Sequence, residues 1–272
     1  MCTVSVLEIA NLTYIYPDKT PALQDISFEI PAKSKVAILG ANGSGKSTLL
    51  QHLNGLTLAQ SGVVSVLGQR IGKENLRDIR KTVGIVFDSP DEQLFSTLVY
   101  DDIAFGPRNL GYDEKKVAQK VEEVMTLLDI TQLRNRPPFN LSLGQKKRVA
   151  IAGVLAMEPS IMVFDEPFSG LDPCTLQQFL KILEDLFCRG HTIIVTTHDV
   201  DIVYGWANEF VVLQEGHVLA HGGRALLEDK MLMEKAKLKA PDLYNIFCST
   251  SYRPVCAADA AECVKRIGGN DK

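Results

Sequence analysis

The sequence lacks the features that would tie it to a membrane span, to nucleic acid or to secretion. It has no run of about 18 apolar residues, which excludes a transmembrane helix. No basic segment followed by an apolar core opens the chain, so we expect no secretory signal. Lysine and arginine (29) are outnumbered by aspartate and glutamate (33), and the net charge of −4 argues against a nucleic-acid partner.

Cysteine is also scarce. The chain has six cysteines, none of them in a C-x-x-C pair, which favours a cytosolic protein with reduced thiols. Cys248, Cys256 and Cys263 lie near the C-terminus, in a segment without histidine. We expect free thiols there, and a metal site is the alternative.

Strand and helix patterns alternate along the 272 residues. Apolar residues at helical spacing predict helices over 113–130, 175–187 and 224–239. Such alternation indicates an α/β fold with a largely parallel central sheet. The last residues, 268–272, are predicted to be disordered. The predicted strands are 4–9, 26–30, 62–68, 83–87, 161–164 and 192–196.

The most informative segment is a glycine-rich loop that satisfies G-x-x-x-x-G-K-[ST], the pattern of a P-loop. An apolar strand leads into it and a helix follows. Backbone N–H groups in such a loop converge on phosphate oxygens, and the helix N-terminus adds its positive end. The alternative is a glycine-rich turn that binds nothing. The predicted nucleotide-binding residues are Gly40, Ala41, Asn42, Gly43, Ser44, Gly45, Lys46, Ser47 and Thr48.

A second chemical motif follows the apolar strand 161–164. Asp165 stands at its carboxyl end, where a phosphate-linked Mg²⁺ would lie. Lys46 would reach the β- and γ-phosphates, and the Ser47 hydroxyl would ligate Mg²⁺. Glu166 is placed to polarise a water for attack on the γ-phosphate. ATP and Mg²⁺ are therefore the expected ligands, and an acidic helix cap is the alternative for the two carboxylates.

The segment 141–145, L-S-L-G-Q, narrows the choice of family. Together with the P-loop and the acidic pair it resembles the ATP-binding-cassette (ABC) family, whose signature is usually L-S-G-G-Q. Ser142 and Gln145 also form an S-x-x-Q capping box, so a helix is expected to continue over 146–155. A capped helix without a ligand is the alternative interpretation of this segment.

The resemblance covers residues 1–222. It implies a P-loop NTPase with a RecA-like core, an N-terminal antiparallel β-subdomain and an α-helical subdomain over about 89–156. Residues 223–272 would form a C-terminal extension that either helps dimerisation or is an idle tail. Two cassettes of this family sandwich two ATP molecules head to tail, so a second ABC ATPase subunit, identical or different, is an expected partner.

The resemblance also implies roles for individual residues. Tyr16 matches the aromatic residue that stacks on adenine, with Tyr14 as the competing candidate. His198 matches the switch histidine that contacts the γ-phosphate and completes the catalytic pair with Glu166. Residues 169–172 match the D-loop at the dimer interface. The residues expected at the partner subunit's nucleotide are Ser142, Gly144 and Gln145.

Two residues depart from the family pattern. Asp88 stands where the family has the Q-loop glutamine, and it is shorter and offers only acceptors when ionised. We expect it to keep a metal contact with altered Mg²⁺ dependence, and Gln93 is the alternative substitute. Leu143 replaces a glycine and suits the first turn of a helix, so function should survive.

The segments 89–95 and 104–110 resemble the ATPases of energy-coupling-factor importers, particularly those of cobalt and nickel uptake. This implies a peripheral protein on the cytoplasmic face of the cell membrane. A transmembrane coupling protein would dock on Asp91, Glu92 and the following helix, with a solvated acidic turn as the alternative for the two acids, and a membrane subunit would bind the cargo. The alternatives are a vitamin-importing complex, a soluble non-transport ABC ATPase, and a regulatory subunit without turnover.

Overall fold

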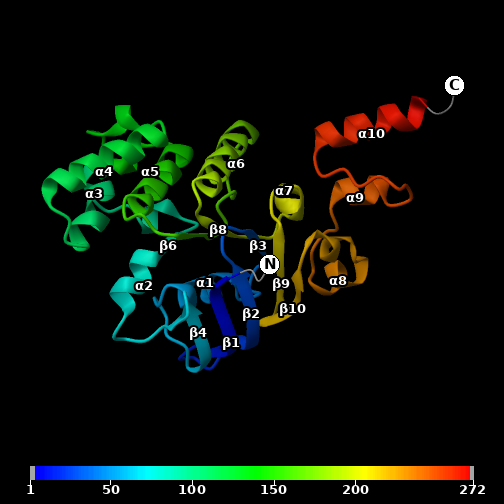
Figure 1. Cartoon of the computed structure of the whole chain (residues 1–272), viewed down its shortest axis with the longest axis horizontal. Helices are drawn as coiled ribbons and strands as arrows, with labels where there is room; N and C mark the ends of the chain where they lie inside the picture. Colours follow the sequence, from blue (N-terminus) through cyan, green and yellow to red (C-terminus); the bar gives the residue numbers. More distant parts are fainter. Residues whose placement is uncertain (1–3, 270–272) are drawn as a thin grey trace.

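The computed structural model describes residues 4–269, which form two sheets with helices packed around them (Figure 1). The central sheet has the strand order β10-β9-β3-β8-β7-β6. Its strands run parallel except β10, which pairs antiparallel with β9. The predicted α/β class is therefore confirmed. The bounds are β3 (Lys35–Leu39), β6 (Val83–Val86), β7 (Ile161–Phe164), β8 (Thr192–Thr197), β9 (Glu209–Gln214) and β10 (His217–Gly222).

The second sheet is antiparallel and lies on the other side of helix α1 (Figure 1). Its inner face joins α1 and one face of the central sheet in a single core that contains Val36 and Ile38. Ala37 and Leu39 point the opposite way, into the core under the helices, because successive side chains of a strand alternate. The bounds are β1 (Ser5–Ile15), β2 (Pro21–Pro31), β4 (Ser61–Val66), β5 (Gln69–Arg70) and α1 (Lys46–Leu53).

A helical segment covers the β6 edge of the central sheet (Figure 1). Its helices bury apolar stripes such as Val117, Val121 and Val124 of α4. The bounds are α2 (Leu76–Thr82), η1 (Pro90–Glu92), α3 (Val99–Asn109), α4 (Glu114–Leu127), η2 (Thr131–Leu133), η3 (Pro138–Asn140) and α5 (Leu143–Leu155). Helices α6 (Pro173–Cys188) and α7 (Val200–Tyr204) precede and follow β8. No helix in residues 4–269 is both long and apolar enough to cross a bilayer.

The C-terminal segment corrects two sequence predictions. The single helix expected over 224–239 is divided at Asp229, whose backbone is extended and whose carboxylate accepts the N–H groups of Met231 and Leu232. Asp229 thus caps a new helix and ends the one before. The predicted disorder of residues 268–272 is wrong for 268–269, because helix α10 extends to Gly269. Residues 270–272 lie outside the described residues. The bounds are η4 (Arg224–Glu228), α8 (Lys230–Lys235), α9 (Asp242–Phe247) and α10 (Ala257–Gly269).

Candidate active site

The glycine-rich loop joins the buried strand β3 to the N-terminus of α1. Gly43 and Gly45 have φ angles of +80° and +101°, in the left-handed region that strains other residues. Lys46 is 6% exposed, and its ammonium donates to the carbonyl oxygens of Gly40 and Ala41 at 2.7 and 3.2 Å. The loop therefore curls around its own lysine and directs backbone N–H groups to the space above α1.

A cavity of about 510 Å³ opens over this loop. Residues from distant parts of the sequence meet there, because the loops after β3, β6 and β7 leave the same edge of the parallel sheet. Ser142, Gly144 and Gln145 are not among the lining residues. The predicted site residues that line the cavity are Tyr16, Asn42, Gly43, Gly45, Lys46, Ser47, Thr48, Asp88 and Glu166.

Tyr16 lines this cavity, and Tyr14 lies behind it. The Tyr16 hydroxyl lies 2.6 Å from Oγ1 of Thr48, which ties the ring to α1. The Tyr14 ring meets the rings of Tyr16 and His52 edge-on, with centroids 5.3 and 4.9 Å apart. The geometry thus favours Tyr16 as the aromatic residue that meets a bound base, and Tyr14 as its support.

Glu166 is the meeting point of the charged groups. Its carboxylate lies 3.1 Å from Nζ of Lys46 and 3.2 Å from Nδ1 of His198. Its φ angle is +38°, and its N–H donates to the Thr196 hydroxyl at 2.9 Å. The Thr196 hydroxyl in turn donates to Oδ1 of Asp165 at 2.7 Å. One threonine of β8 therefore orients both acids.

Asp88 contributes a further carboxylate to this negative cluster. Burial raises the pKa of the Asp88 carboxyl; the Lys147 ammonium opposes the shift, and Asp165 and Glu166 add to it. Like charges gathered in a half-buried cavity favour a cation or an added proton. Asp88 and the exposed Ser47 both line the cavity over the P-loop.

Gln93 does not replace the missing Q-loop glutamine. Both ends of the Gln93 side-chain amide are already hydrogen-bonded: Nε2 donates to the carbonyl of Ala150 and Oε1 accepts the N–H of Phe87, both at 3.1 Å. Gln93 lines a separate groove and not the cavity over the P-loop. The alternative that Gln93 acts at the nucleotide is therefore wrong.

The predicted capping box at the start of α5 is confirmed. The Ser142 side chain accepts the N–H of Gln145, and the Gln145 side chain accepts the N–H of Ser142. Leu143, which replaces the family's glycine, is 40% exposed. Its side chain lies next to Gly170 of the D-loop segment, close enough to contact a Cβ atom if residue 170 had one. The substitution is thus accommodated at the surface without disturbing the cap.

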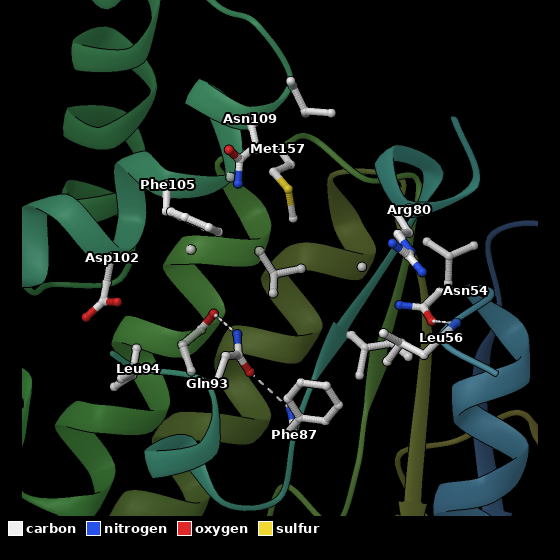
Figure 2. Close-up of a pocket in the computed structure, with 18 of the residues that line it drawn as sticks. Asn54, Leu56, Arg80, Phe87, Gln93, Leu94, Asp102, Phe105, Asn109 and Met157 are labelled. Atoms are coloured by element: carbon white, nitrogen blue, oxygen red, sulfur yellow. Dashed lines mark hydrogen bonds between the residues drawn. The ribbon is translucent and has the colours of Figure 1, made fainter. Parts of the chain in front are cut away.

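An apolar groove of about 540 Å³ runs between β6, α3 and α5 (Figure 2). Phe95 and Phe105 meet edge-on with centroids 4.8 Å apart, and both are largely exposed. Asp102 is 7% exposed, and its Oδ1 accepts the N–H groups of Phe95 and Ser96. Other lining residues labelled in Figure 2 are Asn54, Leu56, Arg80, Phe87, Gln93, Leu94, Asn109 and Met157.

Asp91 and Glu92, the first part of the predicted docking face, do not line this groove, whereas the following helix α3 does, for example through Phe105. Asp91 instead forms a 2.6 Å ion pair with Lys146. The apolar lining comes from residues on both sides of these two acids in the sequence, such as Ile85, Leu94 and Phe105. Cys248, Cys256 and Cys263 are free, and residues 4–269 contain no cluster of three His, Cys, Asp or Glu side chains that could hold a metal.

Comparison with known proteins decides the family. The family model described as "ABC transporter" matches residues 23–169, which include the P-loop and the acidic pair. The chain belongs to the ABC transporter family. It is 52% identical over 241 residues to the energy-coupling factor transporter ATP-binding protein EcfA of Carboxydothermus hydrogenoformans, covering 89% of each chain. EcfA of Methanothermobacter thermautotrophicus is 44% identical, with 88% of this chain and 79% of the relative covered.

Solved ABC structures agree with this assignment. The chain is similar to cbiO1 of Clostridium perfringens, described as part of the ABC transporter complex cbiONQ, with TM-score 0.76, 38% identity and coverage of 89% and 98%. A dimeric post-hydrolysis state of the ATP-binding cassette MJ0796 bound to ADP and Pi gives TM-score 0.73 at 26% identity, with coverage of 80% and 98%. The chain is thus an ABC ATPase of the energy-coupling-factor group.

Two residues that the sequence patterns did not single out contact the site. Thr196 orients Asp165 and the backbone of Glu166. Lys147 is buried in α5 and donates to the segment after Glu166. Lys147 shares a helix face with the apolar residues Ala150 and Ile151, and a lysine at such a position is a signal that a sequence search could use.

Proposed function

We propose that this ABC ATPase converts ATP hydrolysis into movement of a membrane partner in an energy-coupling-factor importer. One observation carries the proposal: Phe87 lines the apolar groove, and the next residue, Asp88, lines the nucleotide cavity. A change at the nucleotide that moves Asp88 is transmitted to the groove through a single peptide bond. The exposed aromatic lining of the groove fits a short helix of a transmembrane coupling protein (Figure 2).

In the proposed site, the residues from Gly40 to Thr48 hold the phosphates and Tyr16 stacks on adenine. Lys46 leaves the Gly40 carbonyl and Glu166 to pair with the β- and γ-phosphates. The Ser47 hydroxyl and the carboxylates of Asp165 and Asp88 would hold Mg²⁺, with water and phosphate oxygens as its remaining ligands. These hard oxygen donors fit the ion, which would neutralise charge on the transferred phosphoryl group.

Catalysis in this proposal comes from positioning and electrostatics. Glu166 accepts a proton from the attacking water, and His198, 3.2 Å from that carboxylate, holds it in place and contacts the γ-phosphate. Ser142, Gly144 and Gln145 lie outside the cavity of their own chain. They are proposed to meet the nucleotide of a second ABC subunit, identical or different, and the dimeric state of the similar cassette MJ0796 supports the existence of such a dimer.

The remaining assignments follow from the resemblance. We propose a transition-metal cargo, cobalt or nickel, bound by a separate membrane subunit, with a vitamin importer as the competing assignment. The protein would sit peripherally on the cytoplasmic face of the membrane, without a nucleic-acid partner. Residues 1–222 would form the cassette, and 223–272 would help dimerisation through exposed apolar residues such as Ile246, Val264 and Ile267.

Purification from the native membrane tests the transport assignment. The tagged chain is expected to copurify in mild detergent with an integral membrane coupling protein and a cargo-binding subunit, whose bound ligand identifies the cargo. Phe105→Ser should abolish this recovery and leave the ATPase rate of the isolated chain intact. Met231→Ser, at an apolar position 82% exposed and outside the groove, is the matched control. Recovery of the wild-type chain without any membrane partner would refute the importer and favour a soluble ABC ATPase.

A further inference from the structure

Lys147 is a buried cation to which the proposed mechanism assigns no role. It lies on the second turn of α5, one turn after the capping box of Ser142. Lysine is rarely buried unless it is paired, yet this residue is only 3% exposed. The neighbouring Lys146 is different, because it points outward to the exposed Asp91.

The Lys147 ammonium is held by two backbone carbonyl groups. It donates to Pro167 O at 2.8 Å and to Ser169 O at 2.9 Å. Both carbonyls belong to the turn that leads from Glu166 into the D-loop segment. The turn itself has only long internal hydrogen bonds, from Ser169 N to Glu166 O at 3.2 Å and from Leu171 N to Phe168 O at 3.3 Å. Both hydrogen bonds from Lys147 are therefore shorter than the two backbone hydrogen bonds within the turn.

This turn needs external support because of the backbone of Glu166. A φ of +38° is unfavourable for glutamate and persists only where surrounding contacts impose it. The Thr196 hydroxyl accepts the N–H of Glu166 on the sheet side. Lys147 holds the carbonyls that follow on the helix side. The residue proposed as the base is thus clamped from both sides.

The charge of Lys147 also acts on the acidic cluster. Burial lowers the pKa of the Lys147 ammonium, and the negative charges of Asp88 and Glu166 oppose this shift. The same ammonium opposes the rise in the pKa of Asp88. Asp88 adds a carboxylate where the family has a neutral amide, and Lys147 is the buried cation that offsets this charge from the α5 side.

We infer that Lys147 is a positioning residue for ATP hydrolysis: it ties the signature helix α5 to the turn that carries Glu166. The inference rests on the proposed role of Glu166. Loss of Lys147 would let this turn relax and shift the Glu166 carboxylate, whereas the P-loop, which holds the phosphates, would stay unchanged. Lys147 therefore acts on the rate of the chemical step and not on the affinity for ATP.

The test compares Lys147→Met, which keeps the length but removes charge and donors, with Lys146→Met as the matched control on the same helix. For the purified full chain, kcat is expected to fall at least about tenfold in Lys147→Met, since two charge-assisted hydrogen bonds are lost. The Kd of ATP and the kcat of Lys146→Met should stay at the wild-type level.

Two outcomes overturn the inference: an unchanged kcat in Lys147→Met, or a parallel loss of ATP affinity. If Lys147→Met does not fold, Lys147→Gln gives the same comparison, because it removes the charge and retains an amide group as a donor. Glu166→Gln separates the two levels of the proposal. If that variant keeps the wild-type rate, the role of Glu166 fails; if it loses activity while Lys147→Met does not, only the role of Lys147 fails.

Discussion

The ammonium of Lys46 and the carboxylate of Glu166 lie 3.1 Å apart, although one belongs to the P-loop and the other to the end of the β7 strand. The lysine that would bind phosphate is therefore paired with the residue that would activate water. Binding of a triphosphate must exchange this pair for contacts of Lys46 with phosphate, and it frees Glu166 to face a water molecule.

Glu166→Gln should lower the ATPase rate at least about 100-fold, because the amide cannot accept the proton from water. The ATP affinity of this variant should equal or exceed that of the wild type, since Lys46 no longer has to break an ion pair with a carboxylate before it binds phosphate. Single-turnover hydrolysis with radiolabelled ATP measures the rate, and size-exclusion chromatography with ATP should detect an accumulated dimer. Hydrolysis at the wild-type rate would remove Glu166 from the role of base.

Asp88→Gln should change the Mg²⁺ dependence of hydrolysis, because a carboxylate ligand is replaced by a neutral amide. A titration of the ATPase rate with Mg²⁺ at saturating ATP checks this. Asp91→Asn is the control, since Asp91 is exposed and paired with Lys146 outside the cavity. An identical Mg²⁺ midpoint in Asp88→Gln and wild type contradicts the metal contact.

Tyr16→Ala should raise the Kd of ATP about tenfold or more, because stacking of an aromatic side chain on a base contributes about 1–3 kcal/mol. Tyr16→Phe keeps the ring and should bind nearly as well, despite loss of the hydrogen bond to Thr48. Tyr14→Ala should mainly lower the melting temperature, since Tyr14 packs on His52 and the core. Fluorescent-nucleotide titration and thermal unfolding separate the two tyrosines, and a larger affinity loss at Tyr14 would reverse the assignment.

His52 should make the fold sensitive to mild acid. Burial lowers the pKa of the His52 imidazole, and its hydrogen bond with the Thr48 carbonyl only partly offsets this. The unfolded chain then binds more protons below its ordinary pKa near 6.5, so the free energy of unfolding falls as the pH drops below that value. The melting temperature should decline more between pH 7.5 and 5.5 in wild type than in His52→Asn. Equal declines would show that another group carries the effect.

Leu143→Gly, which restores the usual family residue, should leave the ATPase rate unchanged and lower the stability by less than about 1 kcal/mol. The capping box of Ser142 and Gln145 does not use the Leu143 side chain, which is why the activity should persist. Steady-state ATPase assays and urea unfolding provide the two measurements. A large change in rate would mean that the Leu143 side chain, which lies next to Gly170 of the D-loop segment, takes part in the site.

Local patterns were sufficient where the chemistry lies in consecutive residues. The P-loop pattern predicted a strand over 36–39, the loop after it and the first turn of a helix over 48–50, and the S-x-x-Q pattern predicted the cap of α5, because glycine freedom and side-chain capping act within a few residues. The break at Asp229 was missed, since the apolar spacing of 224–239 is equally compatible with one helix or two. Gln93 was a candidate on sequence alone, and only its hydrogen bonds to Phe87 and Ala150 remove it from the nucleotide.

By itself the sequence determined the class of this protein, a nucleotide-binding α/β chain with an ABC signature, because each motif is a short run whose geometry is local. The tertiary structure alone decided which side chains meet. The order of the parallel strands brings Asp88, Asp165 and Thr196 to one edge of the sheet. The packing of α5 on the sheet brings Lys147 to the turn after Glu166. Such contacts join residues far apart in the chain, and their geometry depends on the packing of the whole core.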